Sequence, residues 1–405
     1  MSAKRPRDAE IDLDNTRWVP TPTPVFVAPA VSASAEPHPG LTERHQQELR
    51  DYGYTIVEDV IDADKCRAAL DQLWQFVVQL SGGKVRRGDP STYTPAIWPP
   101  YTHHILKGYG IGQLEALWAM RQDPVILGLF STYWGVPAEE LLCSFDGGCL
   151  SPGRREHVTK NSTAAAALDL SPILRKLDEP NVRGELTELD YEATRGWTHV
   201  DESPCQPSTR CIQGLVNLVD SRADGCGGTI VYPRAHRCIR KLMAAFAMDK
   251  NKKNFIKLTA PMLRALAADA RSFFEDDDPL HDAPEPVPIV GVRIGLRAGA
   301  MLLWRSNLPH QGVEPGDEDR YCPTDSAKLY VCLAPRSWAT PEQIAARKLL
   351  FAKGATTSHW PQIAKENSKP RIYSRDRQHP AGDVSALLIT KPEQLQPIGR
   401  KLVGY

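Results

Sequence analysis

The stretch that decides the fold is GWTHVD, residues 196–201. Side chains at positions i and i+2 of a β-strand point to the same face, so a strand here would place His199 and Asp201 side by side. A second histidine, His310, follows the apolar stretch 300–304 after a short loop. In a rolled antiparallel sheet, that stretch brings His310 back beside the first pair. We therefore expect the three side chains to meet.

Two imidazoles and one carboxylate form the ligand set of non-haem iron sites, which keep coordination positions open for oxygen chemistry. The same set also accepts Mn, Co, Ni and Zn, because affinity alone does not select among these ions. The sequence thus predicts a metal site at His199, Asp201 and His310, with Fe(II) as the expected ion. A His-x-Asp tripeptide is common by chance, and the alternative is a surface aspartate beside a core histidine.

Short strands separated by Gly, Pro or Asp are expected from residue 195 onward. They fall near residues 196–201, 211–219, 228–232, 287–294, 300–304 and 327–334. Earlier in the chain we expect a strand at 54–58 and helices at 43–52, 63–80, 111–120 and 124–134. A helical insertion, about 239–285, interrupts the strands. Helices followed by short strands indicate an α+β domain with an antiparallel β-sandwich or barrel as its core.

The whole-chain composition excludes some classes of protein. Lys plus Arg and Asp plus Glu both number 49, so no global field favours nucleic acid or an anionic membrane. No apolar run approaches the roughly 20 residues of a membrane span, and the N-terminus lacks the apolar core of a signal peptide. Nine irregularly spaced cysteines predict reduced thiols in an intracellular, cytoplasmic protein. The basic cluster Lys4–Arg7 leaves nuclear import open.

The chain divides into three parts by composition. Residues 1–40 are rich in Pro, Ala, Ser and Thr, which predicts a disordered tail. One domain is expected over 41–375, followed by a C-terminal extension over 376–405.

Residues 197–236 resemble the phytanoyl-CoA dioxygenase family. They carry His-x-Asp, a strand, a Gly-Gly turn at 227–228, an apolar strand and a Pro-x-x-His ending. Residues 297–310, with RAGAMLLW before a Pro-His pair, resemble the family's approach to its distal histidine. The resemblance covers about residues 195–335, with a weaker match at 141–147. The chain departs from the family's pattern in two places. It has Gly-Ala at 299–300 where the family usually has Gly-Asp, and the insertion makes the distance from Asp201 to His310 long.

This resemblance implies a double-stranded β-helix (jelly-roll, cupin-like) core with flanking N-terminal helices and a helical insertion. It implies Fe(II) held by His199, Asp201 and His310, with 2-oxoglutarate as cosubstrate and O2 as oxidant. The activity would be hydroxylation or another oxidation of a small organic substrate, with release of succinate and CO2. The alternatives are a catalytically inactive ligand-binding protein of the same fold, a metal-dependent hydrolase and an interaction protein. The substrate and the oligomeric state are left open.

A cation is needed to anchor the second carboxylate of 2-oxoglutarate. The resemblance places it about ten residues after the distal histidine, where Arg320 stands, and an arginine fork binds a carboxylate in bidentate fashion. Lys328, which opens the next expected strand, is the alternative as a point charge. Spacing favours Arg320, and both stay open. Asn217, on the strand after the His-x-Asp pair, is a candidate hydrogen-bond partner for the cosubstrate.

Several further residues have two interpretations. Trp197 shares the face of His199 and lines either the pocket or the core. His236 is either a neighbour of the site or a structural histidine, which we favour. Trp304 is expected in the core. The segment 356–361, TTSHWP, is expected to close one end of the barrel, with His359 structural.

Overall fold

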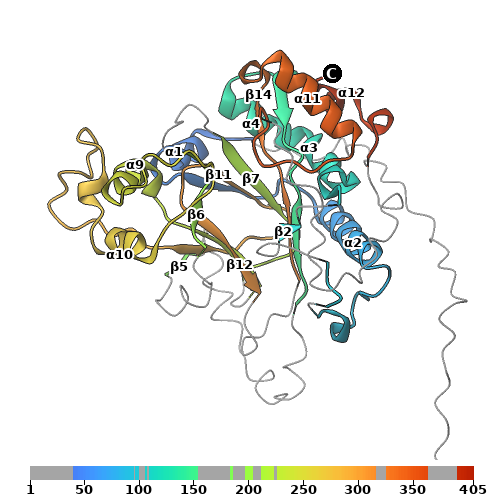
Figure 1. Ribbon diagram of the computed structural model, residues 1–405, viewed down its shortest axis with the longest axis horizontal. Helices are drawn as coiled ribbons and strands as arrows, with labels where there is room; N and C mark the ends of the chain where they lie inside the picture. The colour runs from blue at the N-terminus through green and yellow to red at the C-terminus, as the bar shows by residue number, and fades with distance from the viewer. Residues whose placement is uncertain are drawn as a thin grey trace, which may run out of the picture. The chain divides into compact units, whose positions relative to one another are not determined.

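The strands of the protein pair into two six-stranded sheets, seen in a computed structural model (Figure 1). The structure describes residues 40–94, 96–99, 105–106, 109–153, 183–185, 197–203, 211–222, 226–315, 325–363 and 390–405. All of these lie within one compact unit, Glu36–Tyr405.

Every described strand pair is antiparallel. The first sheet has the order β1 (Tyr54–Val57), β11 (Met301–Arg305), β7 (Ile212–Asn217), β13 (Ser326–Tyr330), β4 (Gly148–Ser151) and β2 (Ile105–Leu106). The second has the order β5 (Arg183–Glu185), β10 (Val292–Ile294), β8 (Cys226–Val231), β12 (His310–Pro315), β6 (His199–Val200) and β9 (Ile256–Lys257). A separate pair joins β3 (Leu141–Cys143) to β14 (Leu333–Pro335).

Helices come before, between and after the strands. They are α1 (Glu43–Asp51), α2 (Ala63–Leu80), α3 (Glu115–Arg121), α4 (Pro124–Trp134), α9 (Ala235–Ala245), α10 (Ala260–Ala268), α11 (Pro341–Ala352) and α12 (Pro397–Val403). No helix in the described ranges is long and apolar enough to cross a membrane.

Local capping explains where the early helices begin. The Thr42 hydroxyl accepts from the backbone N–H of His45 at the start of α1, and Asp62 does the same for Lys65 at the start of α2. Such caps satisfy backbone donors that lack a partner inside the helix. Helix α4 ends at Gly135, whose φ of 65° suits a left-handed cap. The helices predicted near 43–52, 63–80 and 124–134 are confirmed.

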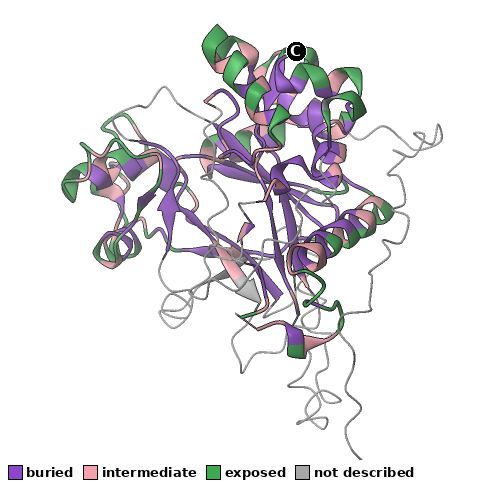
Figure 2. Ribbon diagram, turned by 45° about the vertical axis from the view of Figure 1, so that its right-hand side comes forward, coloured by how far each residue is buried: buried purple, intermediate pink, exposed green. Residues whose placement is uncertain are grey.

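The two sheets pack face to face through an apolar layer. Leu215 and Leu302 of the first sheet contact Val231 and Ile294 of the second in one buried cluster. The predicted α+β fold with an antiparallel sandwich core is therefore confirmed in outline. Figure 2 shows the strands buried between partly exposed helices.

A different set of helices covers the outer face of each sheet. Met301 and Leu329 of the first sheet pack with Phe76 of α2 and Phe130 of α4. Side chains of the second sheet, including Ile230, pack with helices α9 and α10. The predicted insertion is thus the outer cover of the second sheet.

Some predicted boundaries were wrong. The strand expected at 287–294 is confined to Val292–Ile294, and the helix expected at 111–120 is a short 3₁₀ turn, Ile111–Gln113, followed by α3. The insertion also contributes β9, which periodicity did not indicate. Helices α11 and α12 were missed, although a capping box at Thr340 marks the start of α11. Leu402 and Val403 of α12 are buried in the core of the first sheet.

Candidate metal centre

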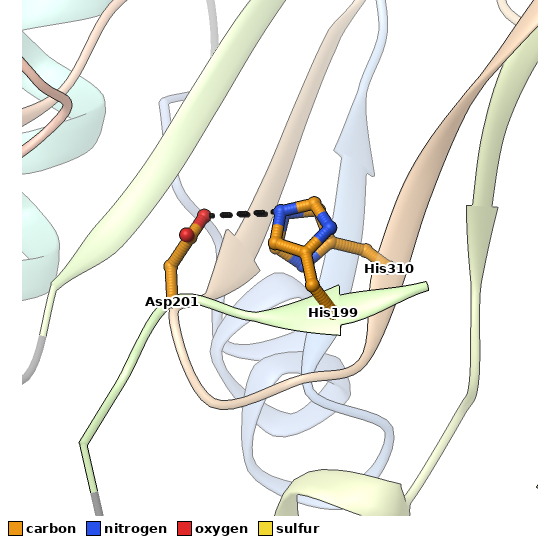
Figure 3. Close-up of side chains that lie close together, drawn as sticks. All are labelled: His199, Asp201 and His310. Carbon is orange, nitrogen blue, oxygen red and sulfur yellow. Dashed lines mark ion pairs between the residues drawn. The ribbon is translucent and has the colours of Figure 1, made fainter. Parts of the chain in front are cut away.

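The three predicted ligands converge between two neighbouring strands. His199 on β6 stands opposite His310 on β12 in the strand register. Asp201 directly follows β6, and its backbone N–H donates to the carbonyl of Ser306. One ligand atom from each of the three side chains lies within 4.8 Å of the others, and Figure 3 shows the side chains pointing toward one another.

Backbone carbonyls fix the tautomers of both imidazoles. Nδ1 of His199 lies 3.1 Å from the carbonyl oxygen of Trp197, and Nδ1 of His310 lies 2.8 Å from that of Leu308. A carbonyl only accepts, so each Nδ1 carries a proton, and in the neutral ring Nε2 then keeps its lone pair. Both Nε2 atoms lie 3.5 Å from Oδ2 of Asp201. This arrangement is typical of metal-binding histidines, whose other ring nitrogen donates to the protein.

The pKa shifts of His199 and Asp201 favour the protonation states in which these two side chains bind a metal. His199, Asp201 and His310 are all buried. Burial lowers the pKa of His199 to about 4, which keeps its imidazole neutral near pH 7. Burial opposes the charge on Asp201, but the imidazoles of His359 and His199 hold the pKa of its carboxyl well below the usual range. Two neutral imidazoles and one carboxylate are the forms that bind a divalent cation.

Gln213 orients the carboxylate, a role that the sequence analysis missed. Its Nε2 donates to Oδ2 of Asp201 over 2.8 Å, and the residue is buried on β7. Side chains alternate along β7, and Ile212 and Val216 face the helices. Gln213 therefore points between the two sheets, as Leu215 does. A polar residue at an inward position of an otherwise apolar strand was the available signal.

His359 lies at the metal centre, whereas we predicted a structural role. Its Nδ1 is 3.9 Å from Oδ2 of Asp201. Phe145 and Thr357 exchange two hydrogen bonds, and Thr356 accepts from the N–H of Gly112, so the segment 356–361 is fixed to the helical side. These hydrogen bonds hold the segment so that His359 lies beside the carboxylate of Asp201.

Lys328 is a buried cation on the inner face of the first sheet. Its Nζ donates to the carbonyl of Gly228 over 2.5 Å, and its side chain is only 3% exposed. Among the residues the structure describes, no carboxylate lies within ion-pair distance of it, and burial lowers its pKa. Gly228 stands opposite Val313, which is three residues, or about 10 Å along the strand, from His310.

The other candidates for cosubstrate binding have different outcomes. Arg320 lies outside the described residues. The Lys4–Arg7 cluster, considered above for nuclear import, also lies outside them. The Asn217 amide donates to the carbonyls of Val219, Leu296 and Arg297. Its donors are therefore used by the backbone, and its role toward a cosubstrate stays a prediction.

Aromatic rings surround the two histidines. Trp197 stacks on His199 with ring centroids 4.9 Å apart and planes 16° apart, and Trp304 lies 5.3 Å from His310. Trp197 thus borders the site and is buried as well. His236 is structural, since its Nε2 faces the carbonyl of Arg50 in α1.

Comparisons with known proteins give remote similarities. No family model matches the chain. Ava biosynthesis cluster protein O from Aspergillus versicolor is 20% identical over 317 residues, which cover 78% of this chain and 85% of that protein.

Similar solved structures include two that hold a metal and 2-oxoglutarate. The epimerase SnoN, in complex with Fe3+, alpha ketoglutarate and nogalamycin RO, is 13% identical over 72% of this chain and 83% of its own, with a TM-score of 0.39. HygX from Streptomyces hygroscopicus, with nickel and 2-oxoglutarate bound, is 14% identical over 73% and 88%, with a TM-score of 0.35. A putative oxidoreductase from Salmonella typhimurium LT2 is 13% identical over 90% and 83%, with a TM-score of 0.46.

Proposed function

We propose that this chain is an Fe(II)- and 2-oxoglutarate-dependent dioxygenase with the double-stranded β-helix core of the phytanoyl-CoA dioxygenase family. The observation that carries the proposal is the convergence of His199, Asp201 and His310 from β6 and β12. Its substrate is a small organic molecule, which the enzyme hydroxylates or otherwise oxidises.

The donor set fits the metal. The Nε2 atoms of His199 and His310 and a carboxylate oxygen of Asp201 would hold the ion, and three protein ligands would leave it able to bind a cosubstrate and O2. Bound Fe(II), with 2-oxoglutarate and O2, supplies the oxidising power and yields succinate and CO2. The protein's own residues hold and orient the reactants.

Lys328 is our proposed anchor for the distal carboxylate of 2-oxoglutarate, with Arg320 as the alternative. A buried cation without an ion-pair partner is costly, and a bound dicarboxylic acid would relieve that cost. The lysine lies on the inner face of the sandwich, about 10 Å along the sheet from His310. A chelating group at the metal and a carboxylate at Lys328 would therefore bind the two ends of one short molecule.

The surrounding residues have positioning roles. Gln213 restrains the Asp201 carboxylate through a 2.8 Å hydrogen bond, and the carbonyls of Trp197 and Leu308 hold the imidazoles in the metal-binding tautomer. The buried Trp197 and Trp304 rings exclude water from the flanks of the histidines. No side chain is required to take a proton from the substrate.

The test is aerobic turnover of 2-oxoglutarate by the Fe(II)-loaded protein, with succinate as the readout. We expect Asp201→Ala to lose metal binding and succinate formation by at least about 100-fold, since even changes behind metal ligands cost about 10- to 100-fold. Glu202→Gln is the matched control, because Glu202 is equally buried and adjacent but outside the triad. Undiminished turnover by Asp201→Ala would overturn the proposal.

The anchor is tested with Lys328→Met and Arg320→Met. A hydrogen bond to a charged group contributes about 1.5–3 kcal/mol. The substitution that removes the true anchor should therefore weaken 2-oxoglutarate binding by about tenfold or more, and the other substitution should not. Lys328→Met should not unfold the protein, because a long apolar side chain replaces a buried charge that has no carboxylate partner among the described residues. Binding of metal and 2-oxoglutarate by the wild type without any succinate would favour the inactive ligand-binding alternative.

A further inference from the structure

The residue just before strand β9 brings an aromatic side chain from the insertion to the metal centre. Ile256 of β9 stands opposite Val200 of β6, and both side chains are buried in the cluster formed with the insertion helices. Side chains alternate along a strand, so Phe255, one residue earlier, faces the other way, toward His199. The two rings lie with centroids 4.5 Å apart and planes 34° apart.

Phe255 differs from the other two rings around the histidines in its exposure. Trp197 is 7% exposed and Trp304 is 4% exposed, whereas Phe255 is 43% exposed. The two tryptophans are therefore already covered by protein. Of these three rings, only Phe255 keeps a substantial surface that a further molecule can cover.

The other exposed phenylalanine of the insertion provides a contrast. Phe246 is 36% exposed at the end of α9, and within the described ranges its ring has no contact with the triad. Exposure of a phenylalanine is thus not special to the metal centre. The combination of exposure with a ring contact to a metal ligand is what distinguishes Phe255.

We propose that Phe255 determines substrate choice and that the substrate presents a flat, unsaturated ring to it. This inference rests on the proposed function. A flat ring would cover the apolar face of Phe255 and gain the offset or edge-to-face contact that aromatic pairs make, which adds to the burial of apolar area. A saturated ring has no π-system with which to make this contact. His199, a proposed ligand of the metal, contacts the same ring, so a molecule on Phe255 would lie beside the proposed reacting centre.

The experiment compares the binding of 2-naphthol and decahydro-2-naphthol to the full chain by equilibrium dialysis. The two probes share a hydroxyl and a carbon skeleton and differ in ring flatness, and neither carries a carboxylate that would compete for a 2-oxoglutarate anchor. The wild type should bind 2-naphthol more tightly by about threefold to tenfold. Phe255→Leu, which keeps apolar area without a ring, should lose the preference.

Phe255→Tyr, which keeps an aromatic ring, should retain the preference for 2-naphthol. Phe246→Leu, the matched control, should leave that preference unchanged. In protein loaded with Mn(II), the bound ion should broaden the proton resonances of 2-naphthol. Equal or absent binding of the two probes by the wild type would overturn the inference. So would a preference that survives in Phe255→Leu, or the absence of broadening in protein that holds Mn(II).

Failure of the proposed function has a separate readout. Mn(II) binding, followed by electron paramagnetic resonance in the wild type and Asp201→Ala, reports on the triad alone. The preference for 2-naphthol is also measured in metal-free protein, where it does not depend on the triad. If only the inference about Phe255 is wrong, the protein still binds Mn(II) but shows no such preference.

Discussion

The two sheets of the sandwich have different covers and different tasks. The first sheet is backed by α2, α3 and α4 and by a core that extends to the C-terminal helix α12. The second sheet is backed by α9 and α10 of one insertion, through a smaller cluster. Yet the second sheet supplies His199 and His310, and Asp201 follows its strand β6. The first sheet contributes Gln213 and Lys328 from its inner face. The comparison indicates that the well-packed sheet is the scaffold and that the thinly covered sheet carries the chemistry.

The largest effect is expected in the scaffold. Phe76 on α2 is 1% exposed, and Phe76→Ala should lower the free energy of unfolding by about 3–5 kcal/mol, because it leaves a cavity in the core. Leu266→Ala on α10 should instead speed hydrogen exchange in α9 and α10 with a smaller effect on the unfolding of the first sheet. Urea denaturation measures the free energy of unfolding, and amide exchange measures the local opening of α9 and α10. Identical, fully cooperative unfolding of both variants would contradict the division between the sheets.

Acid is expected to weaken the attachment of the insertion to α1. Burial, reinforced by Arg305, lowers the pKa of His236 to about 3, while the unfolded chain binds this proton near pH 6.5. The native state therefore excludes a proton that the unfolded state accepts, and stability falls as the pH drops below about 6.5. The loss attributable to His236 should reach about 3 kcal/mol at pH 4.

His236→Gln tests this, since the glutamine amide can still donate to the carbonyl of Arg50. Its unfolding free energy should depend less on pH between 7 and 4 than that of the wild type. The two proteins differ in one titratable group, so an unchanged slope would show that His236 does not control the acid response.

Metal binding is expected to stabilise the second sheet selectively. A divalent ion at about 100 times its Kd stabilises the native state by about 2.7 kcal/mol. Addition of Mn(II) should raise the melting temperature and protect amides in β6 and β12, with little change in α2. Asp201→Ala should show neither effect. Protection spread evenly over both sheets would argue that the ion binds elsewhere.

The smallest effect concerns the contact between the sheets. Gln213→Leu removes the hydrogen bond to Asp201 while conserving most of the volume. Loss of such an orienting partner costs about 10- to 100-fold in metal affinity. Titration with Mn(II) measures it, and Gln213→Glu, which adds a second carboxylate beside the ion, serves as the comparison. An affinity unchanged in Gln213→Leu would mean that the first sheet plays no part in positioning the ligand.

Sequence reasoning succeeded where the pattern is local. Alternation predicted a strand over 196–201, of which the structure keeps His199–Val200 as β6, with Asp201 directly after it. Caps marked the starts of α1 and α2. It did not predict β12 as a strand, because Pro309, Gly312 and Pro315 indicate a loop. It also gave no sign of β9, since two residues are too few to show a period and the strand exists only by pairing with β6.

By itself the sequence determined the pair His199 and Asp201, because two ligand residues at a period-2 spacing are a property of a few consecutive positions. Pairing of β12 with β6 then brought His310, more than 100 residues further along the chain, to that pair. Only the tertiary structure decided which distant side chains join them. Gln213, His359 and Phe255 reach the site through strand pairing and a segment anchored far along the chain. The physical reason is that such contacts are fixed by the packing of sheets and loops, which no local propensity records.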